Sequence, residues 1–193
     1  MKAHALRARP GSDADGQWPG PRADAQGRPD GTSFATGPEP FRAAMRHHAK
    51  GVAVITAGAD GPVGFCATSL ASVSLEPPVL SFTVGLHSAS WRTVETARHV
   101  MVHLLADGQA DLARRFGRAD AAKFGPGTSW HRDALGLPVL DDALAWLLLA
   151  LTSYFPVGDH ALVIGRVIAS RHAAAGRPLV HHNGEFAALA APR

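Results

Sequence analysis

Apolar residues beyond position 50 come in short runs, and Gly, Pro, Asn and Asp stand between the runs. Such runs predict β-strands at residues 52–56, 63–74, 79–84, 100–105, 144–154, 161–170, 179–182 and 186–189. Pro77 and Pro78 end the second of these stretches. Turn residues at 58–61 and 156–159, and the pair Asn183-Gly184, predict hairpins between neighbouring strands.

Helical spacing is confined to three short stretches. They predict a helix with Phe41 and Met45 on one face that Gly51 ends, a helix containing Trp91 and Val94 that Ser88 caps, and a helix containing Leu112 and Phe116 that Asp107 caps. Residues 117–138 read as a loop. Many strands, few helices and frequent turns predict a mainly β fold, an antiparallel barrel with helical caps. Because no Gly-x-Gly-x-x-Gly follows a strand, the sequence does not predict a Rossmann nucleotide site.

Residues 1–38 differ from the rest of the chain. They are rich in Gly, Pro, Asp and Arg and have almost no periodic apolar residues. A segment of this kind cannot bury enough apolar surface to offset its ordering entropy. We therefore expect a disordered N-terminal arm over 1–38 and one globular domain over 39–193.

Composition narrows the class of protein. The 193 residues carry a net charge of +3, and 18% of them are charged, without a dense Lys/Arg run, which argues against nucleic acid as a partner. Cys66 stands alone, so no internal disulfide can form, as suits a reducing cytosol. The N-terminus has no apolar stretch of a secretory signal, and no apolar run is long enough to span a membrane. We expect a cytoplasmic protein.

The segment 64–74 is strand-like but has small or hydroxylated residues at nearly every position. A strand buried only for packing would use more Val, Ile and Leu. Small residues let a flat ligand lie against the backbone, while hydroxyls and free N–H groups bind its polar edge. An ordinary edge strand with exposed Ser and Thr is the alternative interpretation.

Two further segments carry candidate chemistry. The predicted helix start at 87–93 contains Ser88, Ser90 and Arg92, and free N–H groups there suit a phosphate. Simple capping by Ser88 is the alternative. The turn Gly158-Asp159-His160 offers a histidine that could contact a nucleotide. The alternative is a turn histidine whose hydrogen-bonding need Asp159 satisfies.

Taken in order, these segments resemble one family. Residues 51–56, the run Ala67-Thr-Ser-Leu-Ala-Ser-Val-Ser74, residues 109–116, Gly158-Asp-His160 and Gly184-Glu-Phe186 are similar to the flavin reductase family of short-chain NAD(P)H:flavin oxidoreductases. The resemblance covers about residues 41–190. It implies a split β-barrel, a homodimer, FMN or FAD as the flavin, NADH or NADPH as hydride donor, and a separate flavin-dependent monooxygenase that receives the reduced flavin.

The resemblance also implies site residues. The flavin-lining set would be Cys66, Ala67, Thr68, Ser69, Leu70, Ser72 and Val73. The set that holds the phosphate and ribityl chain would be His87, Ser88, Ser90, Trp91, Arg92 and Thr93. Phe116 and Gly117 would lie near the flavin. Asp159 and His160 would contact the nicotinamide nucleotide.

The needs of hydride transfer and a difference from the family pattern at Cys66 refine this hypothesis. The sequence offers no acid/base dyad, and hydride transfer needs chiefly positioning. His160 is therefore the candidate catalytic residue, orienting the nicotinamide, with proton supply as a second possible role. Cys66 stands where the family commonly has Thr, and we expect a small buried thiol rather than a nucleophile.

Two other functions stay open from the residues. One is a flavin-binding electron carrier that does not react with NAD(P)H. The other is metal binding, because His47-His48 and His181-His182 are adjacent pairs among 11 histidines. Adjacent residues on a strand or helix point in different directions, and no carboxylate or cysteine cluster accompanies them, so the sequence predicts no metal site.

Overall fold

The computed structural model describes residues 37–189, so nearly all of the expected N-terminal arm lies outside the described residues. The chain divides after Met45 into two units, and every strand described belongs to the second, Arg46–Arg193. Helix α1 (Pro38–Arg46) precedes the strands, and none of its residues is buried. Among residues 37–189, no helix is long and apolar enough to cross a membrane.

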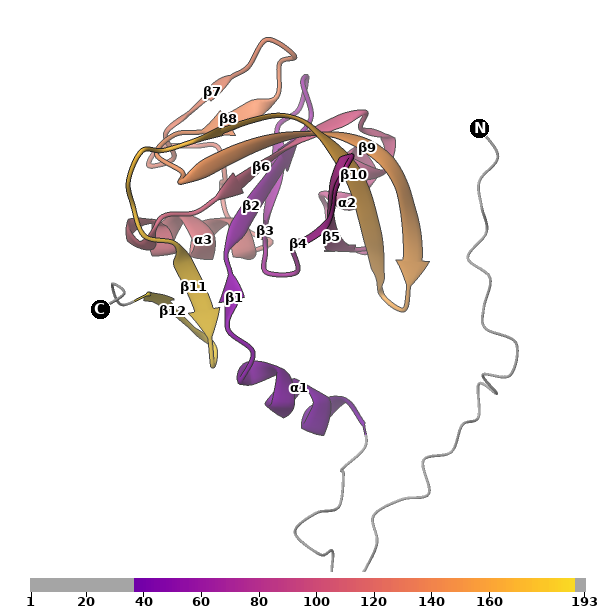
Figure 1. The fold of residues 1–193 in the computed structure, drawn as a ribbon, viewed down its shortest axis with the longest axis vertical. Helices are drawn as coiled ribbons and strands as arrows, with labels where there is room; N and C mark the ends of the chain where they lie inside the picture. Colours follow the sequence, from indigo (N-terminus) through magenta and orange to yellow (C-terminus); the bar gives the residue numbers. More distant parts are fainter. Residues whose placement is uncertain (1–36, 190–193) are drawn as a thin grey trace, which may run out of the picture. The chain divides into compact units, whose positions relative to one another are not determined.

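The second unit is built mainly of antiparallel sheet, as predicted (Figure 1). The order of the seven-stranded sheet is β3 (Val63–Ala67), β2 (Ala53–Ala57), β6 (His99–Leu104), β9 (Ala145–Val157), β10 (His160–His172), β5 (Pro78–Gly85) and β4 (Ala71–Leu75). A three-stranded sheet joins β1 (Lys50–Gly51), β11 (Leu179–His182) and β12 (Glu185–Ala188), and a third sheet pairs β7 (Trp130–Arg132) with β8 (Pro138–Leu140).

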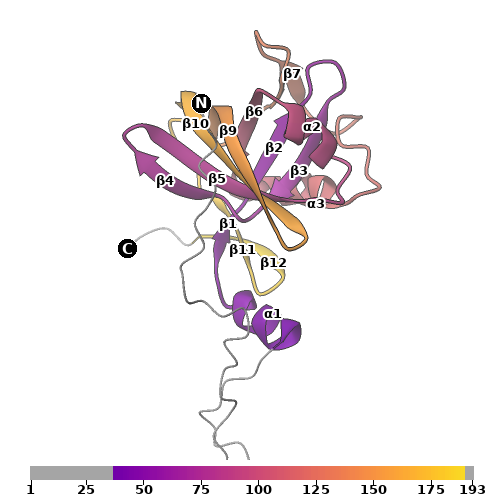
Figure 2. The same cartoon turned by 90° about the vertical axis from the view of Figure 1, so that its right-hand side faces the viewer.

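The large sheet must bend strongly, because its two outermost strands are neighbours in the sequence. Only residues 68–70 separate β3 from β4. Such a link reaches at most about 14 Å, whereas seven strands laid flat would put the outer two about 29 Å apart. The long hairpin of β9 and β10 is correspondingly curved (Figure 1), and Figure 2 shows the β4–β5 hairpin extending from the sheet. The linker 68–70 therefore lies where the two ends of the sheet approach each other.

Two apolar clusters hold the sheet together. In the larger one, side chains of β2, β5, β6, β9 and β10 pack beneath helix α2 (Trp91–Thr96), whose Trp91 and Val94 are buried with Phe82 and Leu149. The smaller cluster packs Phe116 of helix α3 (Ala110–Gly117) against Val54 and neighbouring side chains. Helix α2 thus packs on the larger cluster and helix α3 on the smaller one.

One buried histidine ties three strands together. His103 of β6 is fully buried, with its Nδ1 3.0 Å from the Val54 carbonyl oxygen. The Leu140 N–H donates to His103 Nε2 at 3.0 Å. Since Nε2 accepts, Nδ1 carries the hydrogen and donates to Val54, which is the pattern of a neutral imidazole. Burial lowers the pKa of His103 from 6.5 to about 4, although the bond to Val54 opposes this and His131 adds a smaller lowering.

Several predicted boundaries are wrong, and tertiary pairing explains each. Helix α1 ends at Arg46 rather than at Gly51, because Gly51 pairs with Val180 in a sheet and the Asn183 N–H donates to the Arg46 carbonyl. The single extended stretch predicted at 63–74 is two strands, β3 and β4, at opposite ends of the sheet order. The predicted loop 117–138 contains β7 and the start of β8.

The predicted helix caps are also wrong. Ser90, not Ser88, is the N-cap of α2, and its hydroxyl contacts the Gly64 carbonyl at 3.4 Å instead of capping. Asp107 begins the short 3₁₀ helix η1 (Asp107–Gln109), and its carboxylate accepts from Arg177 at 2.8 Å. The turn at Asn183-Gly184 is confirmed: both residues have positive φ, 50° and 87°, as a tight hairpin turn requires.

Candidate functional site

A pocket of about 300 Å³ opens beside the linker between β3 and β4. Its volume is at the lower end of the range for small-ligand clefts. Most of the side chains around it are small or carry a hydroxyl. The lining residues are Phe65, Cys66, Ala67, Thr68, Ser69, Thr83, Val84, Gly85, Ser88 and His160.

Strand pairing brings the distant parts of the pocket together. β10 runs antiparallel to β5 with His160 opposite Gly85. The linker is tied to the same strand, because the Thr83 N–H donates to Ser69 Oγ at 2.9 Å and the two hydroxyls lie 2.9 Å apart. The start of β10, the end of β5 and the linker therefore form one wall.

His160 stands at this wall with a defined orientation. Its Nδ1 lies 2.7 Å from Asp159 Oδ1, and half of the imidazole surface is exposed. Because a carboxylate only accepts, Nδ1 donates, and a neutral ring keeps Nε2 as a free acceptor. The hydrogen bond from His160, followed by its charge, holds the pKa of the Asp159 carboxyl below its ordinary value. Asp159 thus positions His160.

Two glycines leave space that side chains would fill. A Cβ on Gly85 would lie 4.0 Å from His160 Nε2 and from Ser88 Cβ, so a longer side chain would project between them. A Cβ on Gly117, at the end of α3, would lie 4.0 Å from Cys66 Cβ. The pocket is therefore a cradle of mainly small side chains, which suits a flat ring held by hydroxyl and backbone groups.

Cys66 is not poised as a nucleophile. Burial raises the pKa of its thiol from 9.0 to about 11, so the thiol stays protonated at neutral pH. Cys66 is therefore a small, partly buried and protonated thiol. Cys66 serves the pocket by its small size.

Comparison with known proteins identifies the family. The sequence profile described as "Flavin reductase like domain" matches residues 45–190. The chain belongs to this family. The match includes every strand of the structure and all the residues that line the pocket.

Relatives of this flavin reductase domain carry consistent names. An NADH:FMN oxidoreductase of Rhodococcus erythropolis is 40% identical over 152 residues, which cover 76% of this chain and 79% of the relative. The reductase subunit of a flavin-dependent monooxygenase of Rhodococcus jostii is 36% identical over 156 residues, 80% of each chain. Both alignments span most of each protein.

Solved structures agree with this assignment. An NADH:FAD oxidoreductase of Streptomyces globisporus, solved with NAD and FAD fragments, superposes with a TM-score of 0.76 at 27% identity, covering 81% of this chain and 97% of that chain. A flavin reductase domain protein of Arthrobacter gives a TM-score of 0.74 at 32% identity, covering 79% and 96%. The flavin reductase family fold predicted from the sequence is confirmed.

The structure gathers only part of the predicted site into the pocket. From the predicted set, the lining residues are Cys66, Ala67, Thr68, Ser69, Ser88 and His160. Asp159 holds His160, and Gly117 lies beside Cys66. Outside the pocket lining, Leu70 packs against the larger core cluster, and Ser72 and Val73 are exposed on β4.

The remaining predicted residues lie in helices α2 and α3 or directly before α2. His87 and Arg92 are exposed, Thr93 is partly buried, and Ser90 and Trp91 are buried. Phe116 is buried in the smaller core cluster beneath Gly64. Of the predicted phosphate-binding set, only Ser88 lines the pocket.

Four lining residues were missed from the sequence, namely Phe65, Thr83, Val84 and Gly85. Residues 83–85 end a strand that reads as ordinary alternation. Their role follows from pairing with β10, which the local pattern does not contain. A glycine directly after the run 79–84 was the one available signal.

Gly64 packs directly against the ring of Phe116, and this gives a stability prediction. A Cβ there would lie 2.6 Å from Phe116 Cε1 and 3.3 Å from the Ile55 carbonyl oxygen, both buried. We expect Gly64→Ala to lower the free energy of unfolding by about 1–3 kcal/mol through overpacking. Urea unfolding curves measure this. Gly61→Ala, where a Cβ meets nothing within 4 Å, is the matched control; equal stability of the two variants would contradict the packing argument.

Proposed function

We propose that this protein catalyses the reduction of FMN or FAD by NADH or NADPH. The observation that carries the proposal is the cradle of small and hydroxylated residues beside His160, in a chain that belongs to the flavin reductase like family. When bound, the flavin accepts the hydride that the reduced nicotinamide donates. The protein then needs to hold two flat rings face to face and keep water away.

The pocket residues suit that task. Cys66, Ala67 and Gly85 leave a flat surface without long side chains, and Ser69, Thr68 and Ser88 offer hydroxyl groups to the polar edge of a ring. Nε2 of His160 can accept a hydrogen bond from the carboxamide of the nicotinamide, which fixes the orientation of that ring. Asp159 keeps the imidazole in place through Nδ1. None of these roles requires an acid/base dyad.

His160→Ala tests the assigned role. We expect kcat/KM for the reduced nicotinamide to fall about tenfold, the loss of one well-placed hydrogen bond, while flavin affinity changes less than about twofold. Steady-state kinetics and flavin titration give the two numbers. His172→Ala, at the other end of β10, is the matched control. Equal losses in flavin affinity and nicotinamide use would contradict the role.

A simple assay tests the function itself. Purified protein with added FMN or FAD should oxidise NADH or NADPH faster than the same flavin without protein, and the four combinations reveal both preferences. Flavin binding without oxidation of either nucleotide would favour the electron-carrier alternative. Absence of flavin binding would contradict the proposal as a whole.

We further propose that the reduced flavin passes to a separate flavin-dependent monooxygenase. The relative from Rhodococcus jostii is named as the reductase subunit of such an enzyme, which supports this partner. The half-exposed imidazole of His160 shows that the pocket is open to solvent, which suits a flavin that leaves after reduction. The cytoplasmic location expected from the sequence stays a prediction.

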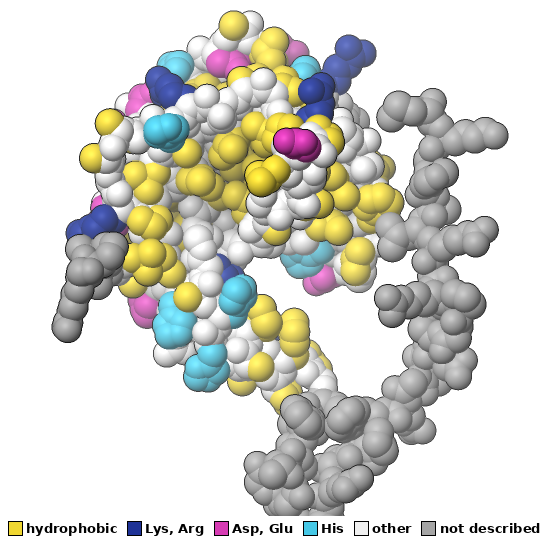
Figure 3. All heavy atoms as spheres, in the orientation of Figure 1, with side chains coloured by type: hydrophobic (Ala, Val, Ile, Leu, Met, Phe, Trp, Pro, Cys, Tyr) yellow, Lys and Arg dark blue, Asp and Glu magenta, His cyan; other side chains and the backbone are white. Residues whose placement is uncertain are grey.

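A homodimer with one catalytic domain per chain, over residues 39–193, is part of the same proposal. On the edge strand β4, Val73 is 56% and Leu75 is 82% exposed. Apolar side chains are also exposed over the sheet in the view of Figure 3. Exposed apolar edge strands favour association, and a second copy would cover them. Light scattering of the purified protein measures the mass in solution.

A further inference from the structure

Ser69 stands where the pairing between β4 and β5 would continue. Figure 2 shows these strands as one hairpin, and Ala71 pairs with Ser81 in its ladder. The same antiparallel register puts Ser69 opposite Thr83. Backbone groups two residues apart on a strand point to the same side, so the Thr83 N–H points toward Ser69. The ladder nevertheless ends at Ala71 and does not include the linker 68–70.

A side chain takes the place of the backbone at this position. In a regular ladder the Ser69 carbonyl would accept from the Thr83 N–H. Instead Ser69 Oγ accepts from that N–H at 2.9 Å, and it lies 2.9 Å from Thr83 Oγ1. Among residues 37–189, no backbone N–H or C=O group of 68–70 has a hydrogen-bond partner in the protein. The Ser69 side chain thus satisfies β5, and the backbone of the linker stays available to a ligand.

The hydroxyls of Ser69 and Thr83 act together. Two hydroxyls carry two hydrogens, and the bond between them uses one, whichever hydroxyl donates. One O–H therefore stays free to donate. Both residues line the pocket beside His160, where Ser69 is exposed and Thr83 is partly buried. The Ser69–Thr83 pair can accordingly fix the linker and still offer a donor to the pocket.

We propose that Ser69 and Thr83 are positioning residues, which hold the linker 68–70 in the conformation that presents its backbone N–H groups to the polar edge of the flavin. This inference rests on the proposed function. The alternative is a direct role, in which Ser69 contributes only a hydroxyl contact to the flavin. The two roles differ in the flavin-free protein, because only the positioning role operates there.

Amide hydrogen exchange of the flavin-free protein tests the positioning role. In Ser69→Ala the Thr83 N–H loses its acceptor, so we expect its exchange to be at least about fivefold faster than in the wild type. Because Ser69 is exposed, the change leaves the apolar core intact. Unchanged exchange at Thr83 in this variant would overturn the inference.

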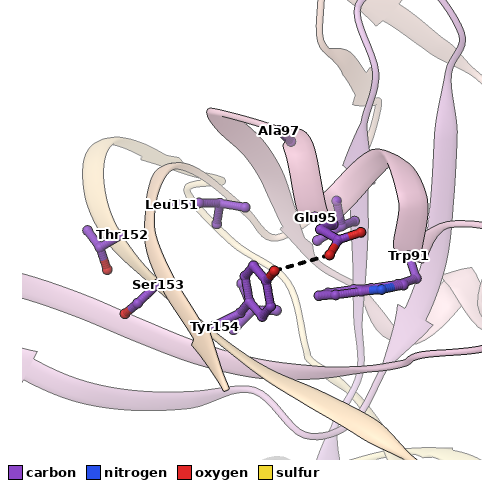
Figure 4. A pocket seen from close by; sticks show the side chains of 9 residues that line it. Trp91, Glu95, Ala97, Leu151, Thr152, Ser153 and Tyr154 are labelled. Carbon is purple, nitrogen blue, oxygen red and sulfur yellow. Dashed lines mark hydrogen bonds between the residues drawn. The ribbon is translucent and has the colours of Figure 1, made fainter. Parts of the chain in front are cut away.

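A hydrogen bond in another pocket supplies the matched control for exchange. Figure 4 shows the Tyr154 hydroxyl donating to Glu95, at 3.1 Å, in a pocket beside α2 that shares no lining residue with the one beside His160. Tyr154→Phe removes this bond and should leave the exchange at Thr83 as in the wild type.

Flavin titration tests the consequence for binding, with FMN or FAD, whichever the wild type binds more tightly. We expect Ser69→Ala to weaken binding about tenfold, because both bonds are lost, and Thr83→Val about threefold, because only the bond between the hydroxyls is lost. The double variant should bind as Ser69→Ala does, since Thr83 acts through Ser69. Independent effects, about thirtyfold in the double variant, would contradict the inference. Ser74→Ala, on β4 outside the pocket, should bind flavin as the wild type does.

The outcomes separate this inference from the proposed function. If the wild type binds neither flavin, the proposed function fails, whereas exchange at Thr83 still decides whether the Ser69–Thr83 pair holds the linker. If Ser69→Ala weakens flavin binding without a change in exchange at Thr83, the hydroxyl contacts the flavin directly and the positioning role is wrong.

Discussion

Replacement of Ser88 by Trp is expected to weaken flavin binding at least about a hundredfold, which corresponds to about 3 kcal/mol. Ser88 lines the pocket from the loop before α2, close to the position where a side chain on Gly85 would meet both Ser88 and His160. An indole at this position fills the cradle that the small residues leave open. Because Ser88 is exposed, the change leaves the apolar core untouched.

Fluorescence titration with FMN and FAD measures the affinity, and circular dichroism checks the fold. Ala89→Trp is the matched control, because Ala89 is the exposed neighbour that does not line the pocket. We expect the control to bind flavin as the wild type does. Undiminished flavin binding by Ser88→Trp would show that the flavin binds elsewhere.

The second large effect concerns stability in mild acid. His103 has a pKa of about 4 in the folded protein, against 6.5 ordinarily, because it is buried. Below pH 6.5 the His103 imidazole binds a proton in the unfolded chain, whereas in the folded chain it binds one only near pH 4. The contribution of His103 to the free energy of unfolding is therefore fully present above pH 6.5. It falls as the pH drops from 6.5 to 4, by about 3 kcal/mol in all.

Urea unfolding at a series of pH values measures this loss. His103→Gln should be less stable than the wild type near neutral pH, because the bonds to Val54 and Leu140 are no longer both satisfied. Its stability should nevertheless change less between pH 6.5 and 4, since the titrating group is gone. Parallel pH curves for wild type and variant would refute the assignment of the acid sensitivity to His103.

The local sequence pattern predicted most strands but not how they are arranged. The runs at 79–84 and 179–182 are strands β5 and β11, and Asn183-Gly184 forms the predicted turn. The break between β3 and β4 was missed because residues 68–70 contain no Gly, Pro, Asn or Asp that would mark a turn. What separates the strands is their pairing with β2 and β5, which are partners distant in sequence.

For the site, too, the local pattern could be predicted from the sequence and the long-range pairing could not. The composition of 64–74 and the Gly-Asp-His turn singled out two segments, of which residues 65–69 and His160 line the pocket, because small size and hydroxyl groups are local properties. The contribution of Thr83 and Gly85 could not be predicted, since it arises from the register that places Gly85 opposite His160. The predicted caps were wrong for two reasons. Ser90 occupies the N-cap position of α2 in place of Ser88. The Asp107 carboxylate accepts a hydrogen bond from Arg177, which is far along the chain.

The most direct measurement is anaerobic mixing of the flavin-loaded protein with NADH or NADPH, followed through the visible absorbance of the flavin. The account predicts rapid bleaching with the wild type and with Ala89→Trp, and only the protein-free rate with Ser88→Trp. Bleaching at the protein-free rate by the wild type, with either flavin and either nucleotide, would contradict it.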